Sequence, residues 1–275
     1  MIFPFIKKFS LISATPSLES LHSLYQCFLR FPYENISKIL KVASGCEGEN
    51  RFRLPEEVWE DFLRHGLGGT CFSLSFFFKK ILDDSGFNTY LVMADRSYGD
   101  NTHCAVVVIL DGKNYLVDPA FLLPQPVEFG KNFLLEGKIW SYEFASLRRR
   151  SRKQSSILDR HVALQAPPDD GIIFHTTRNN QRKLRCTYKN VPVSREDFFH
   201  YWTQSFGWQG MHSVVMTQNI GDKQIYIRDT HLRVNQIGGV QKEKIDLSKI
   251  DPSALPFNIP TQLVRQAWDY LKTQK

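Results

Sequence analysis

Cys71, His103 and Asp118 follow one another in an order that suits a nucleophile, a base and an orienting carboxylate. A cysteine attacks a carbonyl carbon as its thiolate, an imidazole accepts and returns the proton, and a carboxylate holds the imidazole in one tautomer. Taken singly, each residue also has a purely structural reading: a small buried thiol, a hydrogen-bonded strand residue and a turn residue. Together and in this order, the three residues predict an enzyme that transfers acyl groups.

The residues around Cys71 predict a loop that leads into a buried helix. The thiol follows Gly68-Gly69-Thr70 and opens an apolar run that continues through Leu82 to a stop at Gly86. Thr70 is the expected N-cap, so Cys71 would lie in the first helical turn. Unpaired N–H groups and the positive end of the helix dipole favour a thiolate there. The backbone N–H of Cys71 is a candidate oxyanion donor, and no second donor is identified.

His103 and Asp118 lie on a predicted β-hairpin. Residues 103–110 form an apolar strand, Asp111-Gly112 is a strong hairpin turn signal, and residues 115–118 form the returning strand. If the turn has two residues, His103 faces Ala120, and Asp118 lies two residues along on the same face. Such diagonal neighbours lie about 7–8 Å apart, within reach of a hydrogen bond between carboxylate and imidazole.

Three motifs resemble those of the arylamine N-acetyltransferase family, including its N-hydroxyarylamine O-acetyltransferases. The family's Arg-Gly-Gly-x-Cys-Phe-Glu is similar to residues 67–73, Leu-Gly-Gly-Thr-Cys-Phe-Ser. Its Val-Asp-x-Gly-Phe-Gly is similar to residues 117–122, Val-Asp-Pro-Ala-Phe-Leu, and its Pro-Phe-Glu-Asn-Leu to residues 32–36, Pro-Tyr-Glu-Asn-Ile. The resemblance runs from about residue 15 to about residue 130.

The resemblance implies a function, a fold and a set of site residues. The donor would be acetyl-coenzyme A, and the acetyl group would pass through an acetyl-cysteine to an aromatic amine, an aryl hydrazine or an N-hydroxyarylamine. Cys71, His103 and Asp118 would be the catalytic residues of an α+β fold whose Cys-His-Asp core is similar to that of papain and transglutaminase. Tyr33 and Phe121 stand where the family lines its acceptor pocket, although both rings also suit a hydrophobic core.

Four positions depart from the family motifs. Leu67 replaces the arginine, Ser73 the acidic residue, and Ala120 and Leu122 both glycines of the second motif. The added side chains would narrow the cleft beside Phe121, so we expect weaker or altered recognition of coenzyme A. The lost arginine would also remove an ion pair with Glu34, whose carboxylate would then turn to backbone donors.

Two other kinds of function remain open. A transglutaminase-like or peptidase-like enzyme, or an amide synthase that uses another acyl thioester, would need the same thiol, base and orienter. A catalytically silent relative would instead bind an acyl carrier or a partner protein. Metal binding is not expected, because the eight histidines are scattered without paired-ligand spacing.

Composition indicates a folded protein with a sizeable core. The chain has 275 residues, of which 42% are hydrophobic. Its five cysteines are odd in number and form no Cys-x-x-Cys pair, which predicts free thiols in a reducing cytoplasm. Residues 1–8 place their charge after a short apolar run, unlike a secretory signal, and no apolar stretch reaches transmembrane length. We therefore expect a soluble cytoplasmic protein that does not bind membranes.

The positive charge is moderate and partly local. Lys and Arg number 35 against 28 Asp and Glu, a net charge of +7, and residues 148–153 read Arg-Arg-Arg-Ser-Arg-Lys. This run predicts a solvated loop or, as the alternative, a site for an anionic small ligand such as the phosphates of a coenzyme. No nucleic-acid-binding motif accompanies it, so nucleic acid is not an expected partner.

The pattern of elements predicts three subdomains. A helical subdomain at residues 1–87 would carry Cys71, a β-barrel subdomain at 88–193 would carry His103 and Asp118, and an α/β lid would span 194–275. The expected helices span residues 18–31, 55–63, 71–86, 194–206 and 260–271. The expected strands include residues 90–93, 105–110, 172–174, 211–217 and 224–229, and residues 148–170 are expected to form a loop.

Overall fold

The N-terminal part of the chain folds mainly into helices. The computed structural model describes residues 2–11, 15–137, 139–148, 170–249 and 257–274. The first elements are α1 (Ile2–Phe9), α2 (Leu18–Phe28), β1 (Tyr33–Glu34), α3 (Ile36–Ala43), the 3-10 helix η1 (Gly48–Arg51), α4 (Pro55–His65) and α5 (Cys71–Asp84). The predicted α2, α4 and α5 are confirmed, whereas α1 and α3 were not predicted. Both missed helices have only eight residues, too few for a clear periodic pattern.

Aromatic rings hold these helices together. Phe28 on α2 lies 5.3 Å from Phe77 and 4.6 Å from Phe78 on α5, measured between ring centroids. Phe31 stacks on Phe62 of α4 at 3.8 Å. The helix predicted through Phe31 ends at Phe28, since the residue before Pro32 is disfavoured in the helical conformation. The chain therefore turns before Pro32 and enters β1.

The middle of the chain forms an antiparallel sheet of eight strands that curls into a nearly closed barrel. Its spatial order is β5-β4-β3-β2-β9-β8-β7-β6. The strands are β2 (Asn88–Arg96), β3 (Gly99–Leu110), β4 (Lys113–Val117), β5 (Val127–Glu128), β6 (Phe133–Glu136), β7 (Ser141–Arg148), β8 (Asp170–Arg178) and β9 (Gln181–Lys189). Residues 149–169, which hold most of the predicted loop and of the basic run 148–153, lie outside the described residues.

The β3–β4 hairpin has the predicted two-residue turn. Asp111 and Gly112 both have positive φ, 50° and 69°, as a type I′ turn requires. Leu110 pairs with Lys113, and the ladder continues to Val106 opposite Val117. This register is the one predicted for the segment that brings His103 and Asp118 onto one face.

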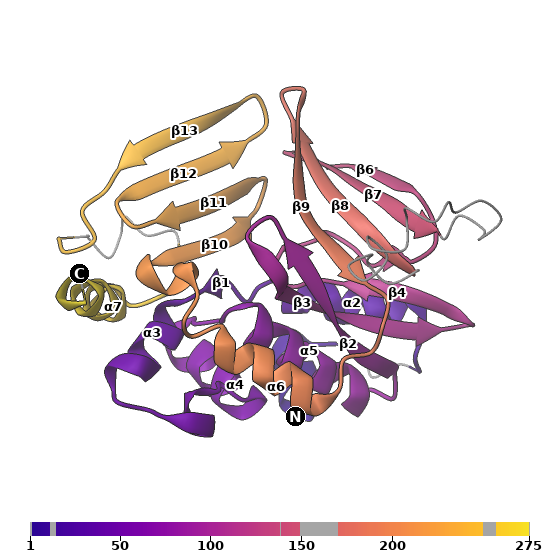
Figure 1. The fold of residues 1–275 in the computed structure, drawn as a ribbon, viewed down its shortest axis with the longest axis horizontal. Coiled ribbons are helices and arrows are strands. Elements are labelled where there is room, and N and C mark those ends of the chain that lie inside the picture. Colours follow the sequence, from indigo (N-terminus) through magenta and orange to yellow (C-terminus); the bar gives the residue numbers. More distant parts are fainter. Residues whose placement is uncertain (1, 12–14, 138, 149–169, 250–256, 275) are drawn as a thin grey trace, which may run out of the picture.

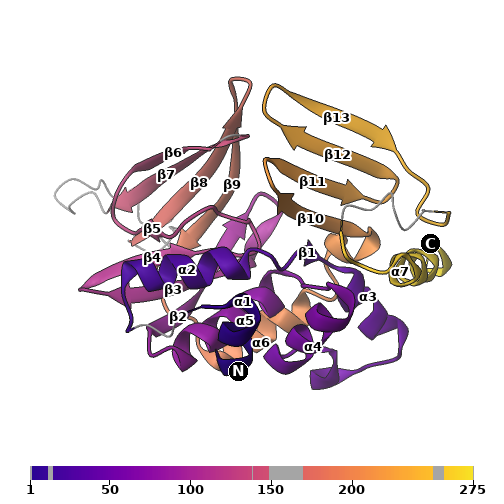
Figure 2. The ribbon, with the colours of Figure 1, turned by 180° about the vertical axis from the view of Figure 1, so that it is seen from behind.

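The C-terminal part forms a second antiparallel sheet in the order β1-β10-β11-β12-β13. Its strands are β1, β10 (Val215–Ile220), β11 (Lys223–Arg228), β12 (His231–Gln236) and β13 (Gly239–Lys244), and the helix α7 (Thr261–Thr273) follows. Figures 1 and 2 show the two sheets standing side by side above the helices. One face of the second sheet buries Met216 and Ile227 in a separate core with Ile39 of α3 and Val264 of α7.

In this part the start of one predicted strand was wrong, and the start of one predicted helix is confirmed. The strand predicted from residue 211 begins at Val215, because Met211 lies in the 3-10 helix η3 (Gln209–His212). The predicted helix after Ser194 is α6 (Arg195–Gln204), and its N-cap hydroxyl accepts from the backbone N–H of Asp197 at 3.0 Å, as expected. Its Trp202 ring stacks on Phe72 of α5 at 6.0 Å, so α6 packs on the N-terminal helices.

None of the helices in the described part of the chain has both the length and the hydrophobicity that a membrane span needs. The subdomain bounds at residues 87 and 193 stay a prediction.

Candidate active site

The loop before Cys71 runs alongside β1. The Gly69 carbonyl accepts from the backbone N–H of Glu34 at 3.0 Å, and the Gly69 N–H donates to the Pro32 carbonyl at 3.3 Å. A Cβ on Gly68 would lie 1.9 Å from the Pro32 oxygen, which no side chain could occupy. The Gly-Gly pair and the Pro-Tyr-Glu segment are thus two halves of one support that holds the start of α5.

A buried arginine joins the same two segments. Arg53 donates from Nη1 to the Gly68 carbonyl at 2.6 Å, and the same atom lies 3.7 Å from Oε1 of Glu34. Glu34 also accepts from the backbone N–H and the hydroxyl of Ser37, at 2.9 and 2.6 Å. Burial raises the pKa of Glu34, and the charge of Arg53 opposes that rise.

The expected backbone donor to Glu34 is present, the N–H of Ser37, but the expected loss of an ion pair with an arginine was wrong. Leu67, which replaces the family's arginine, is buried in the core beneath the second sheet. The cation comes instead from Arg53, outside the motif, so no pattern around Cys71 could have identified it.

Arg53→Gln is expected to lower the free energy of unfolding by about 3–5 kcal/mol, because it leaves the Glu34 carboxylate buried without its cation. Only 3% of the Arg53 side chain is exposed, and none of Glu34. Urea titration followed by circular dichroism measures the change. The matched control is Arg64→Gln, whose ion pair with Glu60 is 71% and 62% exposed and should contribute at most about 1 kcal/mol. Equal stability of both variants would contradict the role given to Arg53.

Cys71 is the first residue of α5, as predicted. Thr70 is its N-cap with φ −85° and ψ 177°, but the Thr70 hydroxyl makes no capping hydrogen bond. The N–H groups of the first turn therefore donate to no capping oxygen of the Thr70 side chain, and the positive end of the helix dipole lies at Cys71. This arrangement favours the thiolate.

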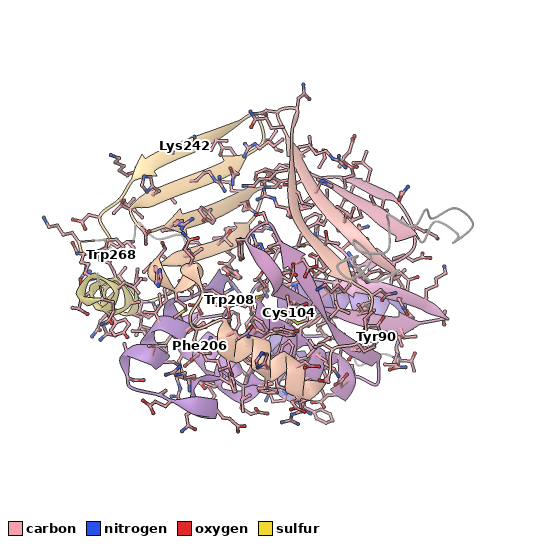
Figure 3. All side chains as sticks on the ribbon, in the orientation of Figure 1. Tyr90, Cys104, Phe206, Trp208, Lys242 and Trp268 are labelled. Atoms are coloured by element: carbon pink, nitrogen blue, oxygen red, sulfur yellow. The ribbon has the colours of Figure 1, made fainter. Side chains whose placement is uncertain are left out.

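The thiol of Cys71 interacts with two side chains of β3, the imidazole of His103 and the thiol of Cys104. These interactions lower the pKa of Cys71 well below that of an ordinary thiol: Cys104 has the largest effect, burial opposes it, and His103 adds to the lowering. Ser75, one turn along α5, donates to the Cys104 carbonyl at 3.2 Å. Figure 3 shows Cys104 where β3 crosses above α5. Cys104 was not predicted as a site residue, since the residue after His103 looks like any other strand residue.

His103 is buried and bonded on its other side to Asp118. Nε2 of His103 and Oδ2 of Asp118 are 2.5 Å apart. Burial alone would lower the pKa of His103, but the Asp118 carboxylate and the Cys71 sulfur raise it to about 9. The site therefore favours a thiolate paired with an imidazolium at neutral pH.

The Asp118 carboxylate is fully buried and saturated with donors. The backbone N–H groups of Ala120 and Phe121 donate to Oδ1 at 2.9 Å each, and the Tyr188 hydroxyl donates to Oδ2 at 2.7 Å. The Tyr25 hydroxyl donates to the Asp118 carbonyl at 2.8 Å. Although burial raises the pKa of Asp118, His103 and the hydrogen bonds lower it overall.

Two tyrosines that donate hydrogen bonds to Asp118 were not predicted as site residues. Tyr25 lies on α2 and Tyr188 on β9, 93 and 70 residues from Asp118. Neither stands in a motif, so only the folded chain identifies them.

Tyr33 and Phe121 both lie beside the three central residues. The Phe121 ring packs edge-on against the His103 ring at 4.6 Å. Burial raises the pKa of Tyr33, and the neighbouring Cys71 raises it further. Both rings are half-buried, which leaves part of each free to contact a ligand.

Ala120 and Leu122, which stand where the second motif has glycines, are both buried. Ala120 is 8% exposed and Leu122 is 1% exposed. Leu122 keeps a left-handed backbone, with φ of 53°, that costs a residue with a Cβ about 1–2 kcal/mol. The turn after Asp118 thus retains a glycine-like path without a glycine.

The rate at which iodoacetamide alkylates Cys71 is expected to stay nearly constant between about pH 6 and about pH 8, because the lowered pKa of Cys71 keeps the thiolate populated. Because the pKa of His103 is raised to about 9, its imidazole stays protonated below that pH, and the ion pair with the thiolate is lost only as the pH rises through about 9. Intact-mass kinetics measure the rate. In His103→Gln the rate should instead rise with pH over this range, because the imidazolium no longer stabilises the thiolate, although Cys104 still lowers the pKa of Cys71. The same slope in the unmodified protein would contradict the ion pair.

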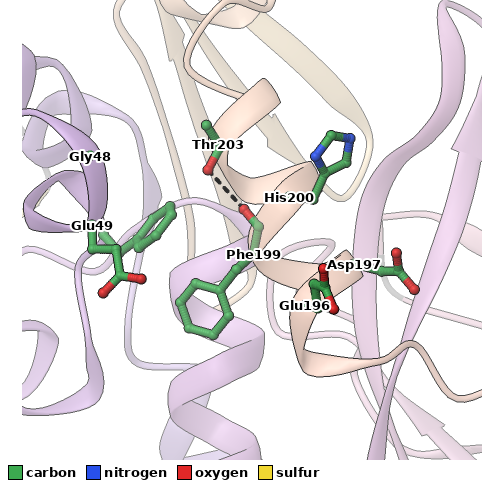
Figure 4. Close-up of a pocket in the computed structure, with 8 residues that line it drawn as sticks. Gly48, Glu49, Glu196, Asp197, Phe199, His200 and Thr203 are labelled. Carbon is green, nitrogen blue, oxygen red and sulfur yellow. Dashed lines mark hydrogen bonds between the residues drawn. The ribbon is translucent and has the colours of Figure 1, made fainter.

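A hollow elsewhere in the protein is lined by none of the residues that surround Cys71. It lies between η1 and α6, has a volume of about 470 Å³, and is bordered by Glu49, Phe52, Phe199 and His200 among others (Figure 4). The described residues that line it include three acidic ones, Glu49, Glu196 and Asp197, and no cysteine that could act as a nucleophile. The candidate active site therefore stays at Cys71.

Comparisons with known proteins match most of this sequence to one family. The sequence profile of the family described as N-acetyltransferase matches residues 17–250. Arylamine N-acetyltransferase 1 of Oryctolagus cuniculus is 28% identical over 195 residues, 66% of this chain. The uncharacterized acetyltransferase YvcN of Bacillus subtilis (strain 168) is 32% identical over 108 residues, 36% of this chain. The matches cover 63% and 40% of these two relatives, so the chain spans less than two thirds of either.

Solved structures show the same fold. The arylamine N-acetyltransferase from Mycobacterium abscessus superposes with a TM-score of 0.76 at 17% identity, covering 98% of this chain and 95% of that one. The enzyme from M. tuberculosis gives 0.75 at 16% identity, covering 98% and 99%. Because the family profile covers most of the sequence and the fold agrees over nearly its whole length, this chain belongs to the arylamine N-acetyltransferase family of acyltransferases.

Proposed function

We propose that this protein transfers an acetyl group from acetyl-coenzyme A through Cys71 to an aromatic amine, an aryl hydrazine or an N-hydroxyarylamine. The observation that carries the proposal is the continuous contact from the Cys71 thiol through the His103 imidazole to the buried Asp118 carboxylate. We assign these residues the roles of nucleophile, proton carrier and orienting carboxylate. Membership of the acyltransferase family supports the reaction type.

In the first half-reaction the Cys71 thiolate attacks the thioester carbonyl. A new S–C bond forms, the bond from the carbonyl carbon to the coenzyme's sulfur breaks, and the leaving thiolate takes the proton of the His103 imidazolium. The Cys71 N–H at the open start of α5 is placed to stabilise the oxyanion. The products are acetyl-Cys71 and free coenzyme A.

In the second half-reaction the acceptor takes the place of the coenzyme. Its nitrogen or hydroxylamine oxygen attacks the acetyl-cysteine carbonyl while neutral His103 removes the attacking group's proton. Cys71 then leaves as the thiolate, and the thiolate–imidazolium pair is restored. The half-buried rings of Tyr33 and Phe121 are our candidates for stacking on a flat acceptor.

A second donor is favoured by one observation. Ala120 and Leu122 are buried in the turn beside Asp118 where the resembling motif has glycines, which changes the space next to Phe121. An amide synthase that accepts a different acyl thioester would use the same thiol chemistry. Acylation of Cys71 by a panel of acyl thioesters distinguishes this enzyme from an acetyltransferase.

The experiment that tests the proposal separates the two half-reactions. The protein is exposed briefly to acetyl-coenzyme A, freed of it by gel filtration, and weighed as the intact chain. One acetyl group on Cys71 is expected, and it should leave when an aryl hydrazide is added, with acetylated hydrazide appearing in the filtrate. A folded protein that gains no adduct from any thioester of the panel would refute the enzyme function and favour a silent binding relative.

A further inference from the structure

Four arginines on the two sheets have no acidic partner among the described residues. They are Arg96 at the end of β2, Arg178 on β8, Arg185 on β9 and Arg233 on β12, called here the arginine cluster. Within the described part of the chain, no carboxylate lies within salt-bridge distance of any of them. Most surface arginines find such a partner or are fully solvated, whereas these four are half-buried.

Aromatic rings support all four guanidinium groups. Arg96 lies over the Phe121 ring at 5.1 Å, and Arg233 lies over the Tyr226 ring at 4.8 Å. Arg178 and Arg185 both lie over the ring of Trp140, at 5.3 and 5.5 Å. A ring that supports the face of a guanidinium leaves its N–H edge available to other groups. Arg178 already donates to Asn235, Gln236 and Gly239, and Nε of Arg185 donates to the Thr176 hydroxyl, so these two bind neutral acceptors that leave their charges uncompensated.

The four charges also lie close enough to repel one another. Burial lowers the pKa of Arg185, and the charges of Arg96 and Arg233 lower it further. Arg233 likewise opposes the charge of Arg178, after burial. Among the residues that the structure describes, none accepts a hydrogen bond from the buried Nε of Arg233. A bound anion would relieve the repulsion and supply the missing acceptor.

The strand register places Arg233 on a line of paired residues that leads to Tyr33 beside Cys71. Across the second sheet, Tyr33 pairs with Thr217, Thr217 with Tyr226, and Tyr226 with Arg233. Directly paired residues share one face of a sheet, and three strand spacings make about 14 Å from Tyr33 to Arg233. Tyr33 lies beside Cys71, and Arg96 continues the positive charge from the first sheet. A ligand that reacts at the Cys71 thiol must therefore extend about 14 Å to place a negative charge beside Arg233.

We propose that the arginine cluster binds the anionic part of an elongated substrate whose reacting end lies at Cys71. This inference rests on the proposed acyl transfer. Four cations over this distance suit a phosphorylated acyl carrier, such as the donor's diphosphate, better than a single carboxylate on a small acceptor. The experiment below distinguishes a diphosphate on the donor from a carboxylate on the acceptor.

The test uses Arg233→Gln and Arg185→Gln in the full chain, because Arg178 also joins the two sheets through the Asn235 side chain at 2.5 Å. Calorimetry measures the affinity for coenzyme A, for uncharged pantetheine and for 4-aminobenzoate. The control is Arg182→Gln, since Arg182 lies on the same strand but is exposed and paired with Glu143. Thermal melting confirms that each variant remains folded.

Each variant of the cluster should weaken coenzyme A binding about tenfold or more, while pantetheine binding and the Arg182→Gln control stay unchanged. A loss confined to 4-aminobenzoate would instead assign the cluster to an acidic acceptor. Unchanged affinity for both anions in folded variants, or no binding of either to the unmodified protein, would overturn the inference. Acylation of Cys71 by S-acetylpantetheine, which lacks phosphates, reports separately on the proposed function.

Discussion

Cys71→Ala should abolish acylation by acetyl-coenzyme A and lower turnover by a factor on the order of 10⁴ to 10⁶, the loss seen when a covalent nucleophile is removed. The alanine keeps the backbone N–H at the start of α5 but provides no atom that can hold the acetyl group. Intact-mass spectrometry measures the adduct, and product chromatography measures turnover.

Two cysteine variants serve as controls for this result. Cys27→Ala changes a half-buried thiol on α2 and should leave the adduct unaltered. Cys104→Ala removes the thiol that interacts with Cys71, so the adduct should form more slowly at low pH as the pKa of Cys71 rises. An acetyl adduct of normal yield in Cys71→Ala would move the nucleophile to another residue.

Asp118→Asn is expected to slow acylation by a factor on the order of 10³ to 10⁴, as when the orienting carboxylate of a triad becomes an amide. The neutral amide cannot stabilise the His103 cation, and the pKa of His103 should fall because the Asp118 charge is what raises it. The thiolate would then lose its paired cation, so the pKa of Cys71 should rise. When the acylation rate is measured as a function of pH, the pH at which it increases should therefore be higher in the variant than in the unmodified protein.

Tyr188→Phe is the matched control for Asp118→Asn. It removes one hydrogen bond of 2.7 Å to Oδ2 and leaves both the carboxylate and its bonds from Ala120 and Phe121. We expect a loss of about tenfold, the size of one net hydrogen bond to a charged group. If Asp118→Asn acylates at the normal rate and with the normal pH profile, Asp118 has only a structural role.

Local sequence patterns were enough to place the reacting groups on their elements. Gly68 and Gly69 before an apolar run predicted the loop and helix that carry Cys71, because the chemical signals for both lie within a few residues. Asp111-Gly112 set the hairpin register, since a two-residue turn admits only one pairing of its strands. That pairing placed His103 and Asp118 on one face, and their atoms are indeed 2.5 Å apart.

Where the local sequence pattern was weak, helices and strand boundaries were predicted wrongly or not at all. The short helices α1 and α3 gave too few turns for a periodic signal, and the end of α2 was predicted three residues late, at Phe31. The segment before β10 looked like a strand but forms η3 instead. Its carbonyls at Gly210 and Ser213 accept hydrogen bonds from Asn35, 175 and 178 residues away.

Sequence alone thus determined the nucleophile, its proton carrier and its orienting carboxylate, because each is specified by neighbours along the chain. Only the tertiary structure decided what supports and surrounds them: Arg53 beneath the nucleophile loop, Tyr188 on the carboxylate, Cys104 on the thiol, and arginines from both sheets. Apart from Cys104, these groups come from segments distant in sequence from the motifs, and even Cys104 carries no mark of its contact. Their roles follow from burial and distance, and folding creates both.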